Sequence, residues 1–257
     1  MSDMVSREGI LRFLKAPLSV TVEPVVTSTN RLLREQAQNG AKEGTVLIAE
    51  TQTEGHGRFD RRFFSPQGTG LYMSVLLRPR VAAEQVSLIT PAAAVAVSRA
   101  VRAVLGKETG IKWVNDVYLD GRKVCGILTE SAFTGNRAAY TVVGIGINVY
   151  VPQGGFPTEL QNVAAALAER EETDLRHRLA AAVLNELWLL YQALPDTAFM
   201  QEYISRSVVI GKEITVCRGG EETIATAREI SENGHLLVQY QDGTEEWLAG
   251  GEISVKL

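Results

Sequence analysis

The densest group of chemically useful residues lies in one short segment near residue 60. It reads Glu54-Gly55-His56-Gly57-Arg58-Phe59-Asp60-Arg61-Arg62, in a chain whose formal net charge is -4. Glycine lets a backbone come close to a ligand, and guanidinium groups present fixed forks of donors that fit carboxylate or phosphate. The segment therefore predicts a small-anion site, with a solvated surface loop as the plain alternative.

A second informative segment, residues 111–130, is predicted to form a β-hairpin. Asp120-Gly121 is a two-residue turn signal between two strand-like runs. The turn would make two cross-strand pairs whose side chains share one face: Tyr118 with Lys123, and Asp116 with Cys125. Asp116 and Lys123 would then be diagonal neighbours, roughly 7–8 Å apart at the backbone. The alternative is an exposed ion pair worth about 0.2–1 kcal/mol and without a functional role.

The third segment is Gly144-Ile145-Gly146-Ile147-Asn148, which ends an almost continuous apolar run from Tyr140. Such a run predicts a strand covered on both faces. Glycine inside a strand marks close approach of a ligand or of another backbone, and plain sheet packing is the alternative. Asn148 could cap a turn or reach a ligand phosphate.

Other elements must position these three segments. Ser28-Thr29-Asn30 offers N-cap chemistry for a helix that ends near residue 39. Hydrophobic spacing predicts further elements: strands over 19–26, 45–50 and 71–77, and helices over 8–15, 82–105, 158–170 and 173–194.

The chain after about residue 208 has no helical period. Asn233-Gly234 and Asp242-Gly243 are type I′ hairpin dipeptides between strand-like runs. We therefore expect a small β-barrel over 208–257. A unit of this size without a disulfide or metal is marginal alone and should dock on the larger domain. Trp247 and Leu248 are candidates for the docking face or for the barrel core.

Composition narrows the class of protein. A pI of about 5.6 argues against DNA binding. Cys125 and Cys217 cannot form a disulfide framework, and three scattered histidines give no support to a zinc site. The amino terminus lacks a signal-peptide pattern and no run of about 18 apolar residues occurs, so no membrane span is expected. The chain is predicted to be cytoplasmic.

Together the segments resemble biotin protein ligases. They occur in that family's order and roughly its spacing: Ser28-Thr29-Asn30, the 55–66 loop, Lys112-Trp113-Val114-Asn115-Asp116, Lys123–Leu128 and Gly144–Asn148. The final Gly251–Val255 resembles the end of the family's SH3-like domain. The resemblance implies an α+β fold with a mixed central β-sheet flanked by helices, as in class II synthetases and biotin–lipoate ligases. It further implies a catalytic domain over 1–207 and an SH3-like β-barrel over 208–257.

The implied activity is an ATP-dependent ligation with Mg²⁺. Biotin carboxylate would attack the α-phosphorus of ATP to give biotinyl-5′-AMP and pyrophosphate. A lysine amine of a biotin carboxyl carrier protein would then take the biotinyl group and release AMP. Such chemistry depends mainly on positioning and charge stabilisation.

The resemblance also assigns residues to roles. The biotin ureido pocket is expected to be lined by Ser28, Thr29, Gln52 and the backbone around His56–Arg58. The other residues implied to bind biotin or the nucleotide include Asn30, Gly55, Gly57, Gly126, Gly144 and Gly146. Arg58 is expected over the acyl-phosphate, and Lys123 on the carboxylate oxygen being activated. Lys112 and Arg61 resemble ATP-phosphate ligands. Asp116 is expected to orient or deprotonate the acceptor lysine. Asn148 lies near the adenylate and Mg²⁺ in the family, and residues 149–158 correspond to the loop that closes over adenine.

Three residues depart from the family pattern. His56 replaces an arginine, Asp60 a glycine and Val114 a proline. The change at His56 should be tolerated, because that position contributes mainly backbone. Asp60 could pair with Arg61 or Arg62 and stiffen the loop before substrate arrives.

The short amino-terminal prefix leaves no room for the DNA-binding domain of bifunctional ligases, so the monofunctional type is expected. The resemblance also implies a homodimer through the central sheet. Two alternatives stay open. One is a lipoate or octanoate ligase of the same superfamily, although those lack this loop and tail. The other is a non-catalytic biotin sensor, which would not need Lys123 and Arg58 together.

Overall fold

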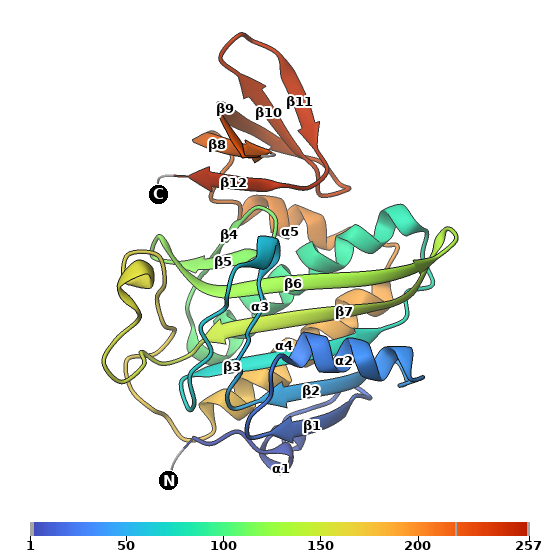
Figure 1. The fold of residues 1–257 in the computed structure, drawn as a ribbon, viewed down its shortest axis with the longest axis vertical. Coiled ribbons are helices and arrows are strands. Elements are labelled where there is room, and N and C mark those ends of the chain that lie inside the picture. The colour runs from blue at the N-terminus through green and yellow to red at the C-terminus, as the bar shows by residue number, and fades with distance from the viewer. Residues whose placement is uncertain (1–2, 219, 256–257) are drawn as a thin grey trace.

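A seven-stranded mixed sheet forms the centre of the larger part of the molecule (Figure 1). The computed structural model describes residues 3–218 and 220–255, apart from the side chains of Asp60, Glu252 and Val255. Side by side, the strands are β1 (Ser19–Glu23), β2 (Thr45–Ala49), β3 (Gly70–Leu77), β7 (Arg137–Asn148), β6 (Arg122–Thr134), β5 (Asp116–Leu119) and β4 (Gly110–Lys112). Only β1 and β2 are parallel.

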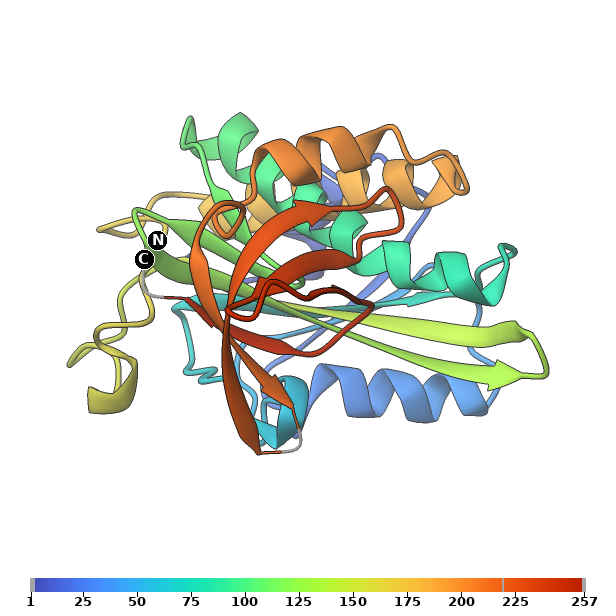
Figure 2. The ribbon, with the colours of Figure 1, turned by 90° about the horizontal axis from the view of Figure 1, so that it is seen from above.

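Helices cover both faces of this sheet (Figure 2). On one face lies α2 (Thr29–Gln38), whose Leu33 and Ala37 pack on β3 and β7. On the other face lie α3 (Ile89–Leu105), preceded by a 3-10 helix at Ala83–Leu88, and α4 (Leu175–Ala193). The remaining helices are α1 (Arg7–Leu11) and α5 (Phe199–Ser205), which pack on α4 and α3. The predicted α+β class and the covering of β7 on both faces are confirmed.

The stretch Ala83–Leu105 is long and apolar enough to cross a membrane, by length and composition alone. Most of that stretch is buried inside the protein, 67% over its most apolar window. Small side chains let α3 lie close to the sheet and to α4, and eleven residues of α3 are buried. The stretch therefore serves as the core helix of this fold.

The second sheet contains the five carboxyl-terminal strands. In spatial order they are β11 (Glu245–Leu248), β10 (Leu236–Tyr240), β9 (Glu221–Ile230), β8 (Glu213–Arg218) and β12 (Glu252–Val255), all antiparallel. Among the described residues β11 and β12 do not pair, so the sheet has two edges and no closed barrel is formed. The expected all-β tail is confirmed as an antiparallel sheet.

The turns of this tail differ from the predicted type. Type I′ needs positive φ at both central residues, and only Gly234 and Gly243 have it. In the second turn, Gly243 N–H donates to Tyr240 O and Tyr240 N–H to Thr244 O, the pattern of a type I turn followed by a left-handed glycine. Asp120-Gly121, by contrast, has φ of 50° and 74°, as a type I′ turn requires.

Trp247 is neither a docking residue nor barrel core, whereas Leu248 belongs to the buried core as expected. Trp247 is 45% exposed on the edge strand β11, while Leu248 is buried. The two sheets are joined instead through Trp113, which is buried and whose Nε1–H donates to Gly234 O at 2.8 Å. Ile111 adds two backbone hydrogen bonds where the chain enters the tail. Its N–H donates to Arg206 O at 2.7 Å, and its carbonyl accepts from Val208 N–H at 3.0 Å.

The helix predicted over 158–170 is also wrong. Only Thr158–Leu160 is helical, as one 3-10 turn. The alanine-rich part that follows runs alongside the ends of β6 and β7, with bridges from Ala164 to Lys123 and from Ala168 to Tyr150. Pairing with two distant strands has overridden the helix preference of alanine.

Candidate active site

A cavity of about 260 Å³ lies where α2, the 55–66 loop and the ends of β5, β6 and β7 meet. All but one of the residues predicted for the site line it: Ser28, Thr29, Asn30, Gln52, His56, Gly57, Arg58, Arg61, Lys112, Asp116, Lys123, Gly126, Gly144, Gly146 and Asn148. Gly55 is buried behind the wall, where an added Cβ would lie 2.4 Å from Phe63 O. The structure therefore brings these predicted residues around one cavity, with Gly55 supporting the loop rather than lining the cavity.

The amino terminus of α2 orients one wall. Ser28 caps the helix by accepting from Arg31 N–H. The backbone N–H and the hydroxyl of Thr29 both donate to Gln52 Oε1, at 2.9 and 3.1 Å. The amide nitrogen of Gln52 donates to Ser65 Oγ at 3.0 Å, so the orientation of the amide group is set by bonds at both its oxygen and its nitrogen. Together these groups offer a small ligand a fixed set of neutral donors and acceptors.

Asn30 is held by the protein itself. Its Nδ2 donates to Leu128 O and to Glu130 Oε2, and its Oδ1 accepts from Ser74 Oγ at 2.6 Å. A Cβ on Gly144 would lie 2.2 Å from that same Oδ1. Of the two interpretations of Gly144, packing is therefore the one that the structure supports, because the glycine makes room for Asn30.

Gly126 and Gly146 face each other on β6 and β7 and form the floor of the cavity. The ring of Phe63 lies over both, since an added Cβ would meet it at 3.3 Å on Gly126 and at 2.6 Å on Gly146. Phe63 also makes an edge contact with Tyr72, whose ring centroid is 6.3 Å away. The missing side chains of the two glycines thus leave a flat slot covered by one aromatic ring.

The 55–62 loop folds back on itself as a small hairpin. Gly57 N–H donates to Arg61 O at 2.7 Å, and His56 forms a bridge with Arg62. At its tip Phe59 adopts a left-handed conformation with φ of 55°. The side chain of Asp60 is outside the described residues, so the predicted pairing of Asp60 with Arg61 or Arg62 stays a prediction.

Arg58 is directed toward the hairpin of β5 and β6. Its guanidinium lies 5.0 Å from the ring centroid of Phe59, and its Nη1 donates to Asn115 Oδ1 at 3.2 Å. Asn115 is itself fixed, because its Nδ2 donates to Ile127 O at 2.8 Å. The loop arginine is therefore anchored to the strand that carries Lys123.

Lys123 and Asp116 form the predicted contact, Nζ to Oδ1 at 2.6 Å, but through a different register. Tyr118 pairs with Lys123 as expected, whereas Asp116 pairs with Gly126 and Cys125 with Val117. A bulge between Val117 and Tyr118 causes this shift. The predicted shared face is thus wrong for Cys125, which is buried in the core and whose thiol pKa is raised by that burial.

The cavity carries excess positive charge. Among the described lining residues, Asp116 is the only carboxylate, against five cations: Arg58, Arg61, Arg62, Lys112 and Lys123. Burial, followed by the negative charge of Asp116, raises the pKa of nearby Tyr118 to about 12, so its hydroxyl stays neutral. Such a field favours an anion, and several converging cations suit a polyphosphate better than a single carboxylate.

Some lining residues carried no sequence signal. Phe63 and Asn115 are uncharged, and Leu160, Val163 and Ala164 come from the segment expected to be helical, whereas Phe156 lies in the 149–158 loop expected over adenine. Gly251 and Ile253 come from the second sheet. The one sequence feature that pointed to such residues is the glycines of β6 and β7, because a floor without side chains needs another side chain packed on it.

Comparison with known proteins identifies the family. Residues 22–148 match the biotin/lipoate A/B protein ligase family, and residues 209–256 match the biotin protein ligase C terminal domain. The bifunctional ligase/repressor BirA of Bacillus spizizenii is 40% identical over 231 residues, 87% of this chain and 70% of that protein. The chain belongs to the biotin protein ligases. The biotin–[acetyl-CoA-carboxylase] ligase of Mycobacterium tuberculosis is 32% identical and aligns with 89% of this chain and 86% of its own.

Solved structures agree with this assignment. Biotin protein ligase from Aquifex aeolicus, in complex with biotin and ATP, has a TM-score of 0.75 at 27% identity, covering 93% of this chain and 98% of that one. The Leishmania major ligase in complex with biotinyl-5-AMP has a TM-score of 0.61 at 25% identity, with 92% and 100% covered. The family and fold predicted from sequence are confirmed, and the lipoate and sensor alternatives are not favoured.

Proposed function

We propose that this biotin protein ligase carries out both steps of biotin transfer in the cavity described above. In the first, a carboxylate oxygen of biotin bonds to the α-phosphorus of ATP while the bond to the bridging oxygen breaks and pyrophosphate leaves. In the second, a carrier lysine nitrogen bonds to the acyl carbon, and AMP leaves with the oxygen. The observation that carries the proposal is the meeting of Arg58, Lys112 and Lys123 around one cavity whose single described carboxylate is Asp116.

The biotin ring system suits the neutral side of the cavity. Gln52, fixed by Thr29, and the capped end of α2 offer hydrogen-bond partners to a ureido group, while Phe63 and the glycine floor offer apolar contact. Lys123 would then hold the carboxylate oxygen that attacks, and Arg58 would cover the acyl-phosphate that forms. Both are cations in a site where negative charge accumulates, which lowers the barrier.

The nucleotide suits the positive side. Lys112 and Arg61 are placed to bind phosphates, and Phe156 and Leu160 give an apolar wall for adenine. Asp116 would orient the incoming amine or take its proton, as the one described carboxylate among the lining residues. We assign these roles to the residues predicted for them from sequence.

Mg²⁺ is proposed to enter with ATP, bound to its phosphates. The described residues contain no group of three or more His, Cys, Asp or Glu that would hold an ion alone. Mg²⁺ commonly takes one or two protein ligands together with substrate phosphates and waters. The amide oxygen of Asn148, on the cavity wall, fits that pattern, and the ion would neutralise the leaving pyrophosphate.

The acceptor is proposed to be the biotin carboxyl carrier protein or domain of a carboxylase, met in the cytoplasm, with no DNA or membrane involved. A homodimer through the central sheet is supported by one feature. Strand β5 pairs with β6 only as far as Gly126, so the rest of β6 has no strand on that side among the described residues. Such an edge is open to pairing with another chain.

The test is a mass measurement. The protein is mixed with biotin, Mg-ATP and a carrier domain, and we expect the carrier to gain one biotinyl group. Replacing biotin with lipoate, or removing Mg²⁺ with a chelator, should abolish the gain. An unmodified carrier with biotin, together with modification by lipoate, would refute the proposal.

A further inference from the structure

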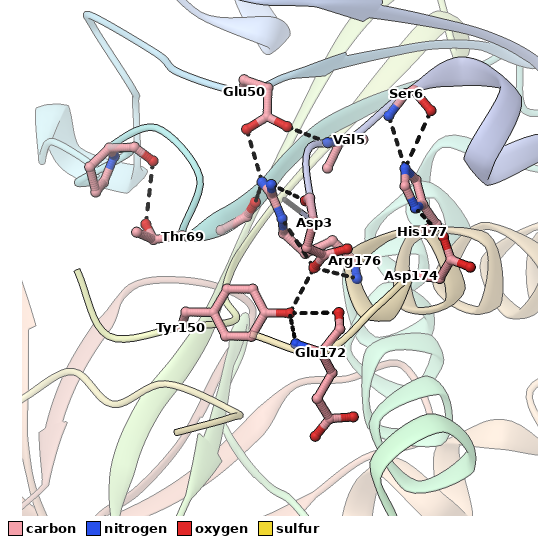
Figure 3. A network of polar contacts seen from close by, with 12 residues as sticks. Asp3, Val5, Ser6, Glu50, Thr69, Tyr150, Glu172, Asp174, Arg176 and His177 are labelled. Carbon is pink, nitrogen blue, oxygen red and sulfur yellow. Dashed lines mark hydrogen bonds and ion pairs between the residues drawn. The ribbon is translucent and has the colours of Figure 1, made fainter. Parts of the chain in front are cut away.

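A buried network of ion pairs and hydrogen bonds joins the amino-terminal segment, β2, β3 and α4 (Figure 3). At its centre is Arg176, in the first turn of α4, which is 2% exposed. Its Nη1 donates to Glu50 Oε2 at 2.9 Å and to Gly70 O at 3.2 Å, and its Nη2 donates to Asp3 O. The carboxylate of Asp3 also accepts from the backbone N–H of Arg176 at 3.2 Å. One guanidinium thus ties three chain segments together.

Two of these segments lead directly into the cavity wall. Glu50 follows β2 and precedes Gln52 by two residues, on the side where Thr29 and the 55–62 loop lie. Gly70 begins β3 at the other end of that same loop region. Arg176 therefore holds both ends of the chain stretch that carries Gln52, the 55–62 loop and Phe63.

Tyr150 connects the same network to the opposite wall. It lies two residues after Asn148, and its hydroxyl donates to Asp3 Oδ2 at 2.7 Å and accepts from Glu172 N–H at 3.2 Å. The backbone N–H groups of Val149 and Tyr150 both donate to Thr69 O, at 3.0 and 2.7 Å. Figure 3 shows Tyr150 and Glu50 on opposite sides of the Arg176–Asp3 pair. The segment that supplies Phe156 and Leu160 is thereby joined to the start of β3.

None of Asp3, Glu50, Tyr150 and Arg176 is among the residues that line the cavity. Whatever they contribute to the reaction must act through the segments that they hold. The two walls share one atom of this network, because Asp3 Oδ2 accepts from both the Tyr150 hydroxyl and the backbone N–H of Arg176. A shift of either segment therefore disturbs the contacts of the other.

We propose that Arg176, Asp3 and Tyr150 are positioning residues that couple biotin binding on one wall to nucleotide binding on the other. This inference rests on the proposed function for the identity of the two ligands. When biotin orders the 50–70 stretch, Glu50 and Gly70 become fixed, and they fix the Arg176 guanidinium that they contact. Arg176 then fixes Asp3. Asp3 in turn fixes the hydroxyl of Tyr150, at the start of the nucleotide-side segment. By linkage, the nucleotide must raise the affinity for biotin by the same factor.

The variant for the test is Tyr150→Phe, because Arg176→Ala would leave two buried carboxylates unpaired and put folding itself at stake. Tyr150→Phe keeps the ring and removes only the hydroxyl that reaches Asp3. The matched control is Tyr191→Phe. Tyr191 lies on α4, is buried, and donates its hydroxyl to the carboxylate of Glu43, but it does not line the cavity.

The measurement is the dissociation constant of biotin, by calorimetry, with and without a saturating non-hydrolysable ATP analogue. We expect the analogue to tighten biotin binding about fivefold or more in the unmodified protein, within the usual range of coupling. Tyr150→Phe should remove most of that factor, and Tyr191→Phe should keep it. Unchanged biotin affinity with the analogue in the unmodified protein, or an equal loss in both variants, would overturn the coupling while leaving the ligase function intact.

A second measurement does not depend on ligands. Hydrogen–deuterium exchange should become faster in Tyr150→Phe at peptides covering residues 48–54 and 147–156 together, and stay unchanged in Tyr191→Phe. Faster exchange at 147–156 alone would show two independent anchors and overturn the inference. Failure of the unmodified protein to bind biotin would instead count against the proposed function, and the exchange result would still decide on the network.

Discussion

Replacing Lys123 by alanine should abolish the first step of the reaction and leave the fold nearly intact. Lys123 lines the cavity and reaches Asp116 at 2.6 Å, and we propose that it contacts the biotin carboxylate there. Its side chain has no other role in the fold that would be lost, because the strand pairing at residue 123 is made by the backbone.

The two consequences of this substitution differ in size. The Lys123 and Asp116 side chains are 26% and 18% exposed, so solvent screens the pair and its loss should cost no more than about 1 kcal/mol of folding free energy. Removing a preorganised donor to developing negative charge typically costs about 10²- to 10³-fold in rate, or about 2.7–4 kcal/mol. The catalytic effect should therefore be clear in a protein that is still folded.

The assay is pyrophosphate release with biotin and Mg-ATP, without carrier. Lys123→Ala should lower the rate by at least about 100-fold, with a melting temperature within a few degrees of the unmodified protein. Asp116→Asn is the comparison, since it should slow transfer from the adenylate to the carrier more than it slows pyrophosphate release. Release by Lys123→Ala within tenfold of the unmodified rate would refute the assigned role.

Gly146→Ala should weaken biotin binding, because the new methyl group would displace the aromatic ring above it, and the same overpacking should cost about 1–3 kcal/mol of folding free energy. Gly250→Ala, with open space around its Cβ position, is the calorimetric control. Trp113→Phe should lower the free energy of unfolding by about 1 kcal/mol, because the hydrogen bond from its indole to the second sheet is lost. The lower stability should appear as a lower urea midpoint, and an unchanged midpoint would count against that contact. Burial raises the pKa of Tyr118 to about 12 from its ordinary 10.0, so as the pH rises the unfolded chain loses this proton before the folded protein does. The free energy of unfolding should therefore fall between pH 10 and 12, by up to about 1.4 kcal/mol per pH unit. Tyr118→Phe should flatten this slope in urea titrations. Asp60→Gly should speed dissociation of the adenylate, measured by stopped-flow chase, and an unchanged rate would contradict a stiffening role.

Features set by local interactions were predictable from sequence. Ser28 caps α2 as its type and position indicated, because the bond it accepts comes from a residue three positions along. Asp120-Gly121 turns the chain with both residues at positive φ. These outcomes need no knowledge of the rest of the molecule, which is why a single sequence contains them.

Features set by distant partners were not predictable. Residues 161–168 are rich in alanine and were expected to be helical, yet they pair with the chain at Lys123 and Tyr150. The bulge near Val117 reverses the face of Cys125 while keeping Asp116 beside Lys123. Spacing alone gave the right ion pair from the wrong register, because long side chains reach diagonal neighbours in either arrangement.

Two glycines on the same strand show how far residue types can be interpreted without a structure. Gly144 and Gly146 lie on the same face of β7, and each lacks a Cβ for a different reason. The space above Gly144 is filled by Asn30, which hydrogen bonds to β3 and β6 fix in place. The space above Gly146 is filled by the ring of Phe63, whose one described ring contact is with Tyr72. A fixed amide cannot yield to a ligand, whereas a side chain on a loop can, so we propose Gly146 as the glycine that makes room for biotin.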